Sequence, residues 1–151
     1  MNSELQDLYQ DVVIDHSKQP RNCRKLEDAT QTAEGVNPLC GDQLTVYLKL
    51  AAGVIEDISF QGDGCAISKA SASLMTTSLK GKTQAEALAL FGHVHALLTS
   101  GPASDVKPED VGKLAALSGV WEFPMRVKCA TLAWHTLRSA LESKDAAHPK
   151  E

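Results

Sequence analysis

The sequence of 151 residues has no apolar run that approaches the roughly 18–20 residues of a membrane-spanning helix. Its acidic, polar N-terminal segment also lacks the basic start and the apolar stretch of a signal peptide. Basic residues are in the minority, since 15 Lys and Arg stand against 19 Asp and Glu and give a formal charge of −4. This balance argues against nucleic acid or an anionic membrane surface as the main partner. We therefore expect a cytoplasmic protein that binds neither nucleic acid nor membranes.

Internal repeats, low-complexity tracts and long linkers are absent as well. With 43% apolar and 23% charged residues, the composition excludes wholesale disorder, and the length fits one domain. We expect a single domain over residues 1–142, followed by a flexible polar tail over residues 143–151.

Hydrophobic spacing predicts an α+β fold, in which a small antiparallel β-sheet has helices packed on one face. Apolar residues recur at helical spacing over residues 5–16, and strict alternation over residues 44–50 predicts a half-buried strand with a returning strand over residues 54–61. Residues 21–38 are polar and are expected to be extended or irregular. Further helices are predicted over residues 66–80, over residues 83–100 behind a Thr83–Glu86 capping box, near Pro108 within a polar insert over residues 102–119, and from residue 124 onward.

The four cysteines form no C-x₂-C pair. Disulfides are rare in the cytoplasm, so the cysteines are considered first for metal binding and catalysis. Cys40 lies in a turn before the first predicted strand, Cys65 lies where the second strand meets a helix, and Cys129 lies in the first turns of the last helix. Cys23 lies in a polar segment away from these junctions and is expected to be an incidental thiol.

A thiol at a helix N-terminus, as expected for Cys65, meets the positive end of the helix dipole and free backbone N–H groups, which favour the thiolate. Asp42, two residues after Cys40, can supply a hard oxygen ligand to the same pocket. Three thiolates and one carboxylate form a four-ligand set that suits Zn²⁺ or an iron–sulfur cluster. The alternative is that each cysteine is a small buried hydrophobic residue.

Three fragments carry a family resemblance: NPLCGD at residues 37–42, GDGCAIS at residues 62–68 and RVKC at residues 126–129. They resemble the cysteine motifs of the U-type iron–sulfur cluster assembly proteins, the IscU, SufU and NifU N-terminal family, and the resemblance covers most of the chain. Proteins of the IscU type carry a His immediately before the third cysteine, where this chain has Lys128. The chain is therefore more similar to the SufU type, which the insert over residues 101–119 also resembles.

The resemblance implies a zinc-dependent acceptor of persulfide sulfur from a pyridoxal-phosphate-dependent cysteine desulfurase of the SufS type. Zinc would be held by Cys40, Asp42, Cys65 and Cys129, and Cys40 would accept the sulfur, because a cysteine on a glycine-flanked loop can leave the metal. The downstream partners would be apo iron–sulfur proteins or a scaffold of the SufBCD type. Two alternatives stay open: a scaffold that assembles and delivers a transient [2Fe–2S] cluster, and a small zinc-stabilised domain without sulfur chemistry.

Three further residues are expected to support the site. Gly41 and Gly64 flank two of the cysteines and allow the backbone or a partner to approach closely. Arg126 lies three residues before Cys129 on the same helical face, where it either steadies the anionic site or is a solvated surface residue. His16 is expected to take part in packing or in a partner contact rather than in metal ligation.

Overall fold

The computed structural model describes residues 3–38, 41–100 and 106–142, and only the backbone of residues 3–8, 108–109, 119 and 121–122. The expected C-terminal tail over residues 143–151 lies outside the described residues. The helices and strands in chain order are α1 (Ser3–Lys18), β1 (Gln31–Asn37), β2 (Asp42–Ala51), β3 (Val54–Asp63), α2 (Ala66–Leu79), α3 (Gln84–Ser100), α4 (Pro108–Val111), the 3₁₀-helix η2 (Gly112–Glu122) and α5 (Pro124–Glu142).

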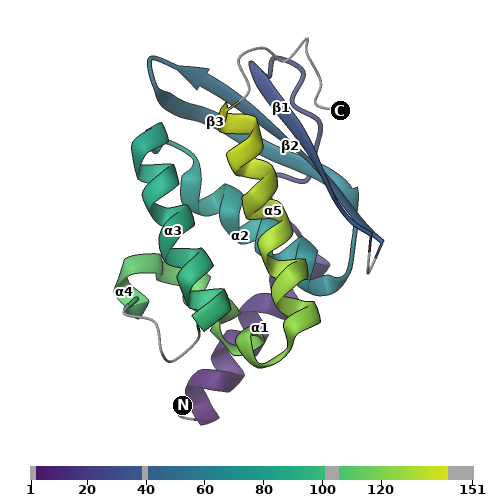
Figure 1. Ribbon diagram of the computed structural model, residues 1–151, viewed down its shortest axis with the longest axis vertical. Coiled ribbons are helices and arrows are strands. Elements are labelled where there is room, and N and C mark those ends of the chain that lie inside the picture. Colours follow the sequence, from purple (N-terminus) through teal and green to yellow (C-terminus); the bar gives the residue numbers. More distant parts are fainter. Residues whose placement is uncertain (1–2, 39–40, 101–105, 143–151) are drawn as a thin grey trace.

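Three antiparallel strands in the order β1-β2-β3 form the sheet, and helices cover one of its faces. Helix α5 packs against β1 and β2, and helix α2 packs against β3 (Figure 1). Helix α1 packs on α2 and η2, while α3 packs on η2 and α5. The predicted α+β architecture is confirmed.

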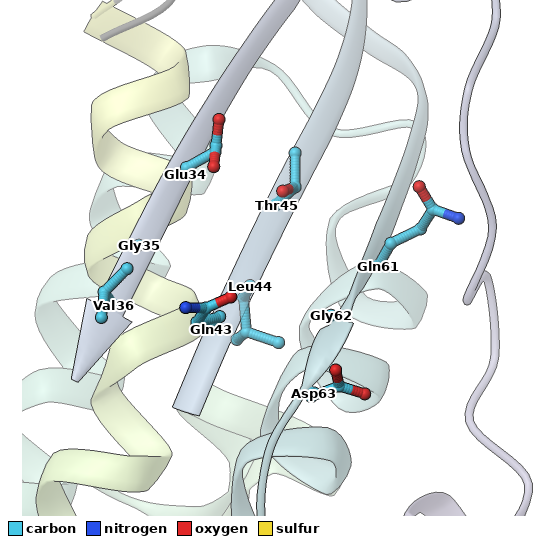
Figure 2. A pocket seen from close by; sticks show the side chains of 9 residues that line it. All are labelled: Glu34, Gly35, Val36, Gln43, Leu44, Thr45, Gln61, Gly62 and Asp63. Carbon is cyan, nitrogen blue, oxygen red and sulfur yellow. The ribbon is translucent and has the colours of Figure 1, made fainter. Parts of the chain in front are cut away.

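Strand β2 shows how the sequence selects the buried face of the sheet. Leu44, Val46 and Leu48 alternate with more polar residues and are at most 2% exposed on the side that faces the helices. Asp42 begins the strand in the same phase and is therefore also buried on this side, at 2% exposure. The opposite face carries a shallow hollow of about 180 Å³, lined by residues 34–36, 43–45 and 61–63 (Figure 2).

Strand β1 lies within residues 21–38, for which the sequence predicts only an extended or irregular segment. Residues 31–37 pair with β2 along their full length. Ala33 and Gly35 face α5, and residues this small give no hydrophobic alternation that a sequence pattern detects. They are small because α5 lies close: a Cβ on Gly35 would overlap Thr136 Oγ1 and lie 3.2 Å from Thr136 Cβ.

The segment after residue 105 corrects the expectation of a polar insert with one short helix. Helix α4 is that short helix, but η2 follows it directly. Leu114 and Leu117 of η2 are fully buried in the core. Because a 3₁₀-helix repeats every three residues, its apolar positions do not match the spacing that predicts an α-helix. Residues 102–105 of the expected insert lie outside the described residues.

The helix termini agree with their sequence signals. Helix α1 ends at Lys18, two residues before Pro20. The capping box of α3 is confirmed, because the Thr83 N–H donates to Glu86 Oε1 at 2.9 Å and the Glu86 N–H donates to Thr83 Oγ1 at 3.1 Å. Strand β3 runs through to Asp63, two residues beyond its predicted end. Within the described residues, no helix combines the length and the apolar character needed to cross a bilayer.

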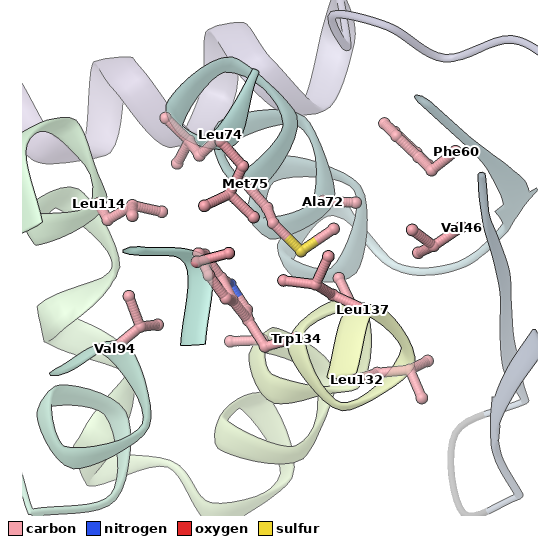
Figure 3. Close-up of a cluster of buried hydrophobic side chains, with 14 of the residues drawn as sticks. Val46, Phe60, Ala72, Leu74, Met75, Val94, Leu114, Leu132, Trp134 and Leu137 are labelled. Carbon is pink, nitrogen blue, oxygen red and sulfur yellow. The ribbon is translucent and has the colours of Figure 1, made fainter. Parts of the chain in front are cut away.

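The hydrophobic core lies between the sheet and the helices α2, α3, η2 and α5. Trp134 of α5 is 1% exposed and lies among Met75, Leu114 and Val94 (Figure 3). Because this core holds α2 and α5 against each other and against the sheet, it also fixes the ends of these helices relative to the start of β2.

His16 is a buried packing residue that connects α1 to α2 and is not part of a metal-ligand group among the described residues. Its side chain is 5% exposed, and its Nδ1 lies 2.7 Å from Ser73 Oγ. The Arg21 N–H donates to the same oxygen at 2.8 Å, so the Ser73 hydroxyl proton is free to face a neutral imidazole. Burial lowers the pKa of His16 below its ordinary value of 6.5, because desolvation disfavours the imidazolium.

Replacing Gly35 with Ala should lower the free energy of unfolding by about 1–3 kcal/mol, because the new Cβ overlaps Thr136 and pushes β1 away from α5. Chemical denaturation measures the change. Gly92→Ala in α3 is the matched control: a Cβ at Gly92 meets nothing within 4 Å, so this change should raise the free energy of unfolding by about 0.5–1 kcal/mol. Equal stability of Gly35→Ala and the wild type would contradict the close contact.

The lowered pKa of His16 predicts a loss of stability on acidification. Below pH 6.5 the unfolded chain binds a proton on His16 before the folded chain does, so the free energy of unfolding falls until the pH reaches the lowered pKa of the folded protein. An NMR titration of the His16 ring protons should give a midpoint below 6.5, and His16→Gln should weaken the pH dependence of unfolding in this window. A midpoint at or above 6.5 would rule out the desolvated imidazole.

Candidate functional site

Asp42, Cys65 and Cys129 come together from three different elements. Asp42 begins β2, Cys65 is the N-cap residue of α2, and Cys129 lies in the second turn of α5. One ligand atom of each residue lies within 4.8 Å of the ligand atoms of the other two. Two thiols and a carboxylate at this separation could hold one metal ion. The three predicted ligands that the structure describes therefore form one group.

Cys65 occupies the predicted place at a helix N-terminus and is exposed to solvent. Its backbone is extended, with φ −70° and ψ 171°, and its Sγ accepts a hydrogen bond from the Ser68 N–H at 3.5 Å. The first N–H groups of a helix have no partner within the helix. The sulfur thus takes the role that an oxygen plays in an ordinary N-cap residue.

Both carboxylate oxygens of Asp42 accept hydrogen bonds from the start of α2. Oδ1 accepts the Cys65 N–H at 3.0 Å, while Oδ2 accepts the Ser68 hydroxyl and lies 3.6 Å from Cys65 Sγ. The N-terminal end of α2 is a favourable place for an anion. Because the Cys65 thiol proton faces Oδ2, a metal ion can take the place of that proton between sulfur and oxygen, as metal binding releases ligand protons. The donor set therefore fits a metal ion.

Cys129 lies on the inner side of the group. Its side chain is 4% exposed, in contrast to the exposed Cys65. Its backbone carbonyl oxygen lies 3.1 Å from Ser68 Oγ, which places α5 against the first turn of α2. The group thus has one buried sulfur, one buried carboxylate and one sulfur that solvent and partners can reach.

Three glycines shape the backbone around the group. A Cβ on Gly64 would lie 3.0 Å from Ser68 Cβ and 3.3 Å from Asp42 Oδ1, so the absence of a side chain lets the carboxylate approach the α2 turn. Gly41 has a φ of +76°, a conformation that favours glycine. Gly62, to which the sequence analysis gives no role, has a φ of +145°, and a Cβ there would overlap the backbone of β2.

Cys23 and Arg126 lie outside the group, and the position of Cys40 is not described. Cys40, the expected acceptor and fourth ligand, lies outside the described residues. Cys23 is exposed, and its backbone bridges to Phe60 on β3. Arg126 is exposed, and its guanidinium carbon lies 4.7 Å from the centroid of the Phe123 ring, a cation–π contact. A supporting role for Arg126 stays a prediction.

The hollow on the outer face of the sheet is a different place from this group. Its lining consists of residues 34–36, 43–45 and 61–63, which include none of the three potential ligands (Figure 2). The chemistry favours the group on the helix side, because among the described residues it is there that soft sulfur and hard oxygen donors meet.

Ser68 is a second residue of the site, after Gly62, to which the sequence assigns no role. It lies three residues after the N-cap Cys65, the spacing at which the first turn of a helix interacts with its cap. That spacing predicts the contact of the Ser68 N–H with Cys65. It does not predict the contacts of the Ser68 hydroxyl with Asp42 and with the Cys129 carbonyl.

Residues 8–141 match the family described as NifU-like N terminal domain. The chain is 39% identical over 147 residues to the zinc-dependent sulfurtransferase SufU of Bacillus subtilis, a match that covers 97% of this chain and 98% of the relative. It is 42% identical over 147 residues to the iron–sulfur cluster assembly scaffold protein IscU of Streptococcus pyogenes, with 97% and 91% covered.

Solved structures share the fold. FiSufU from Fervidobacterium islandicum, described as a candidate scaffold for iron–sulfur cluster assembly in the SUF system, has a TM-score of 0.82 at 34% identity and covers 90% of this chain and 98% of its own. A crystal structure described as that of a hypothetical protein has a TM-score of 0.83 at 38% identity, with 91% and 99% covered. The three-stranded sheet with its helices is therefore common to these proteins.

Proposed function

The chain belongs to the family of NifU-like N-terminal domains and is an iron–sulfur cluster assembly protein of the IscU and SufU type, and on that basis we propose that it is a zinc-dependent acceptor of persulfide sulfur. The donor is a pyridoxal-phosphate-dependent cysteine desulfurase, and the recipients are apo iron–sulfur proteins or a scaffold of the SufBCD type. The observation that carries the proposal is the group of Asp42, Cys65 and Cys129, with ligand atoms within 4.8 Å of one another.

Asp42, Cys65 and Cys129 would hold the zinc, and Cys40 would complete a four-coordinate set. Zinc keeps a coordinating thiol deprotonated at neutral pH. Structural zinc sites are normally closed sets of Cys and His, whereas this set includes a carboxylate and the exposed Cys65. This difference favours a reactive centre over an ion that only stabilises the fold.

The sulfur transfer is an exchange between two sulfur atoms. The Cys40 thiolate attacks the outer sulfur of the persulfide on the desulfurase; a new S–S bond forms on Cys40, the old S–S bond breaks, and the desulfurase cysteine leaves as a thiolate. No external oxidant or reductant is needed, because the transferred sulfur atom keeps its oxidation state and one thiolate replaces another. Cys40 precedes Asp42 by two residues, which span at most about 7 Å along the chain, a separation that would let its sulfur serve as the fourth ligand.

The second candidate is a scaffold that assembles and delivers a transient [2Fe–2S] cluster. The relative from Streptococcus pyogenes, 42% identical to this chain, is named as such a scaffold. The exposed Lys128 weighs against this candidate, because an ammonium group has no lone pair to offer iron where an imidazole would have one.

Protein purified without oxygen should be colourless and should contain about one zinc per chain. Asp42→Ala, Cys65→Ala and Cys129→Ala should each lose this zinc, since each removes one donor, while Cys23→Ala should keep it. Elemental analysis and competition with a chromophoric chelator measure the zinc, and circular dichroism verifies the fold of each variant. Zinc retained by Cys65→Ala or Cys129→Ala would disprove the ligand set, and brown protein with iron and inorganic sulfide would favour the cluster scaffold.

Cys40→Ala should accept no sulfur from the cognate cysteine desulfurase, because it removes the attacking thiolate, while Cys23→Ala should accept sulfur at the wild-type rate. Transfer from radiolabelled cysteine measures the rate, and peptide mass spectrometry locates the added sulfur. A persulfide found on Cys65 or Cys129 in the wild type, or normal transfer to Cys40→Ala, would overturn the assignment.

A further inference from the structure

Ser68 is the one described residue that contacts all three members of the Asp42–Cys65–Cys129 group. It is fully buried in the first turn of α2. Its hydroxyl is in hydrogen-bond contact with Asp42 Oδ2 and lies 3.1 Å from the Cys129 carbonyl oxygen, and its backbone N–H donates to Cys65 Sγ at 3.5 Å.

The serine hydroxyl has one proton and faces two acceptors. A carboxylate is the stronger acceptor of the two, because hydrogen bonds to a charged group are shorter and stronger than those to a neutral carbonyl. The proton therefore goes to Asp42 Oδ2. Oδ1 is held at the same time by the Cys65 N–H at 3.0 Å, so the carboxylate cannot rotate without breaking one of two hydrogen bonds.

This arrangement limits how Asp42 can bind an ion. Oδ2 accepts the Ser68 proton and also faces the Cys65 thiol proton, with Sγ at 3.6 Å, so an ion that displaces the thiol proton would meet this oxygen. Oδ1 faces the backbone of Cys65. The carboxylate is therefore oriented before an ion binds, so that Oδ2, beside Cys65 Sγ, is the oxygen available to the ion.

We propose that Ser68 is a positioning residue of the metal centre: its hydroxyl holds Asp42 as a one-oxygen ligand beside Cys65 and sets the metal affinity of the site. This inference rests on the proposed function, since it requires that the group binds zinc. Groups that orient a metal ligand without touching the metal typically contribute a factor of about 10–100 to metal affinity.

The chain contains a matched control for Ser68 on the same helix. Ser71 is also fully buried, and its hydroxyl donates to the Ala130 carbonyl of α5 at 2.6 Å. Both serines thus place a hydroxyl oxygen against a backbone carbonyl of α5, and these two carbonyls are one residue apart. Only Ser68 also contacts the Asp42 carboxylate.

The test compares Ser68→Ala with Ser71→Ala in the full chain. Ser68→Ala should bind zinc about 10–100-fold more weakly than the wild type in competition with a chromophoric chelator, and the visible spectrum of its Co²⁺ form should change, because the carboxylate is free to bind through either or both oxygens. Ser71→Ala should keep the zinc affinity and the Co²⁺ spectrum of the wild type. A Co²⁺ spectrum reports the ligand geometry, which a general loss of stability does not alter.

A second pair of variants keeps the test decisive if Ser68→Ala does not fold. Ser68→Thr keeps the hydroxyl, and Ser68→Val introduces a side chain with nearly the shape of threonine but without the hydroxyl. Ser68→Thr should retain the affinity and spectrum of the wild type, and Ser68→Val should lose both.

The outcomes separate this inference from the proposed function. If the wild type binds neither zinc nor Co²⁺, the proposed function fails and the inference fails with it. If the wild type binds both but Ser68→Ala matches Ser71→Ala, or Ser68→Val matches Ser68→Thr, the proposed function stands and the role of Ser68 is refuted.

Discussion

The hydrogen bonds of the Asp42 carboxylate are the constraint on which the site depends. A carboxylate that is 2% exposed is costly to bury unless its oxygens have partners. The Cys65 N–H and the Ser68 hydroxyl are these partners, and both belong to the start of α2. The requirement to satisfy one buried charge therefore fixes where α2 begins relative to β2, and with it the position of the Cys65 sulfur.

The core supports this arrangement from a distance. Trp134 and its neighbours hold α5 against α2 and the sheet, so the second turn of α5 brings Cys129 to the same point. Gly35 contributes from the opposite side, because only a residue without a side chain lets α5 lie so close to β1. Ligands that are far apart in the sequence thus meet through ordinary packing of a sheet and two helices.

Sequence patterns predict the parts of this protein that depend on local chemistry. The N-terminal place of Cys65, the Thr83–Glu86 capping box and the alternating burial along β2 follow from neighbouring residues. Strand β1 does not, because Ala33 and Gly35 are small for a reason that lies on α5, about a hundred residues along the chain.

The role of Ser68 is hidden from the sequence for a similar reason. The hydroxyl partners of Ser68 belong to residues 26 and 61 positions away, one on β2 and one on α5. A serine in the first turn of a helix has many uses, and only the tertiary structure shows which one applies. The ligands themselves could be proposed from residue type and family resemblance, whereas the groups that orient them could not.

The two sulfurs of the group differ in their exposure to solvent. Cys129 on α5 is 4% exposed, while Cys65 faces solvent at the N-terminus of α2. Among the described members of the group, Cys65 is therefore the one whose sulfur an approaching ion or partner can reach from solvent. A protein that covers Cys65 would thus shield the exposed sulfur of the group from solvent for as long as it stays bound.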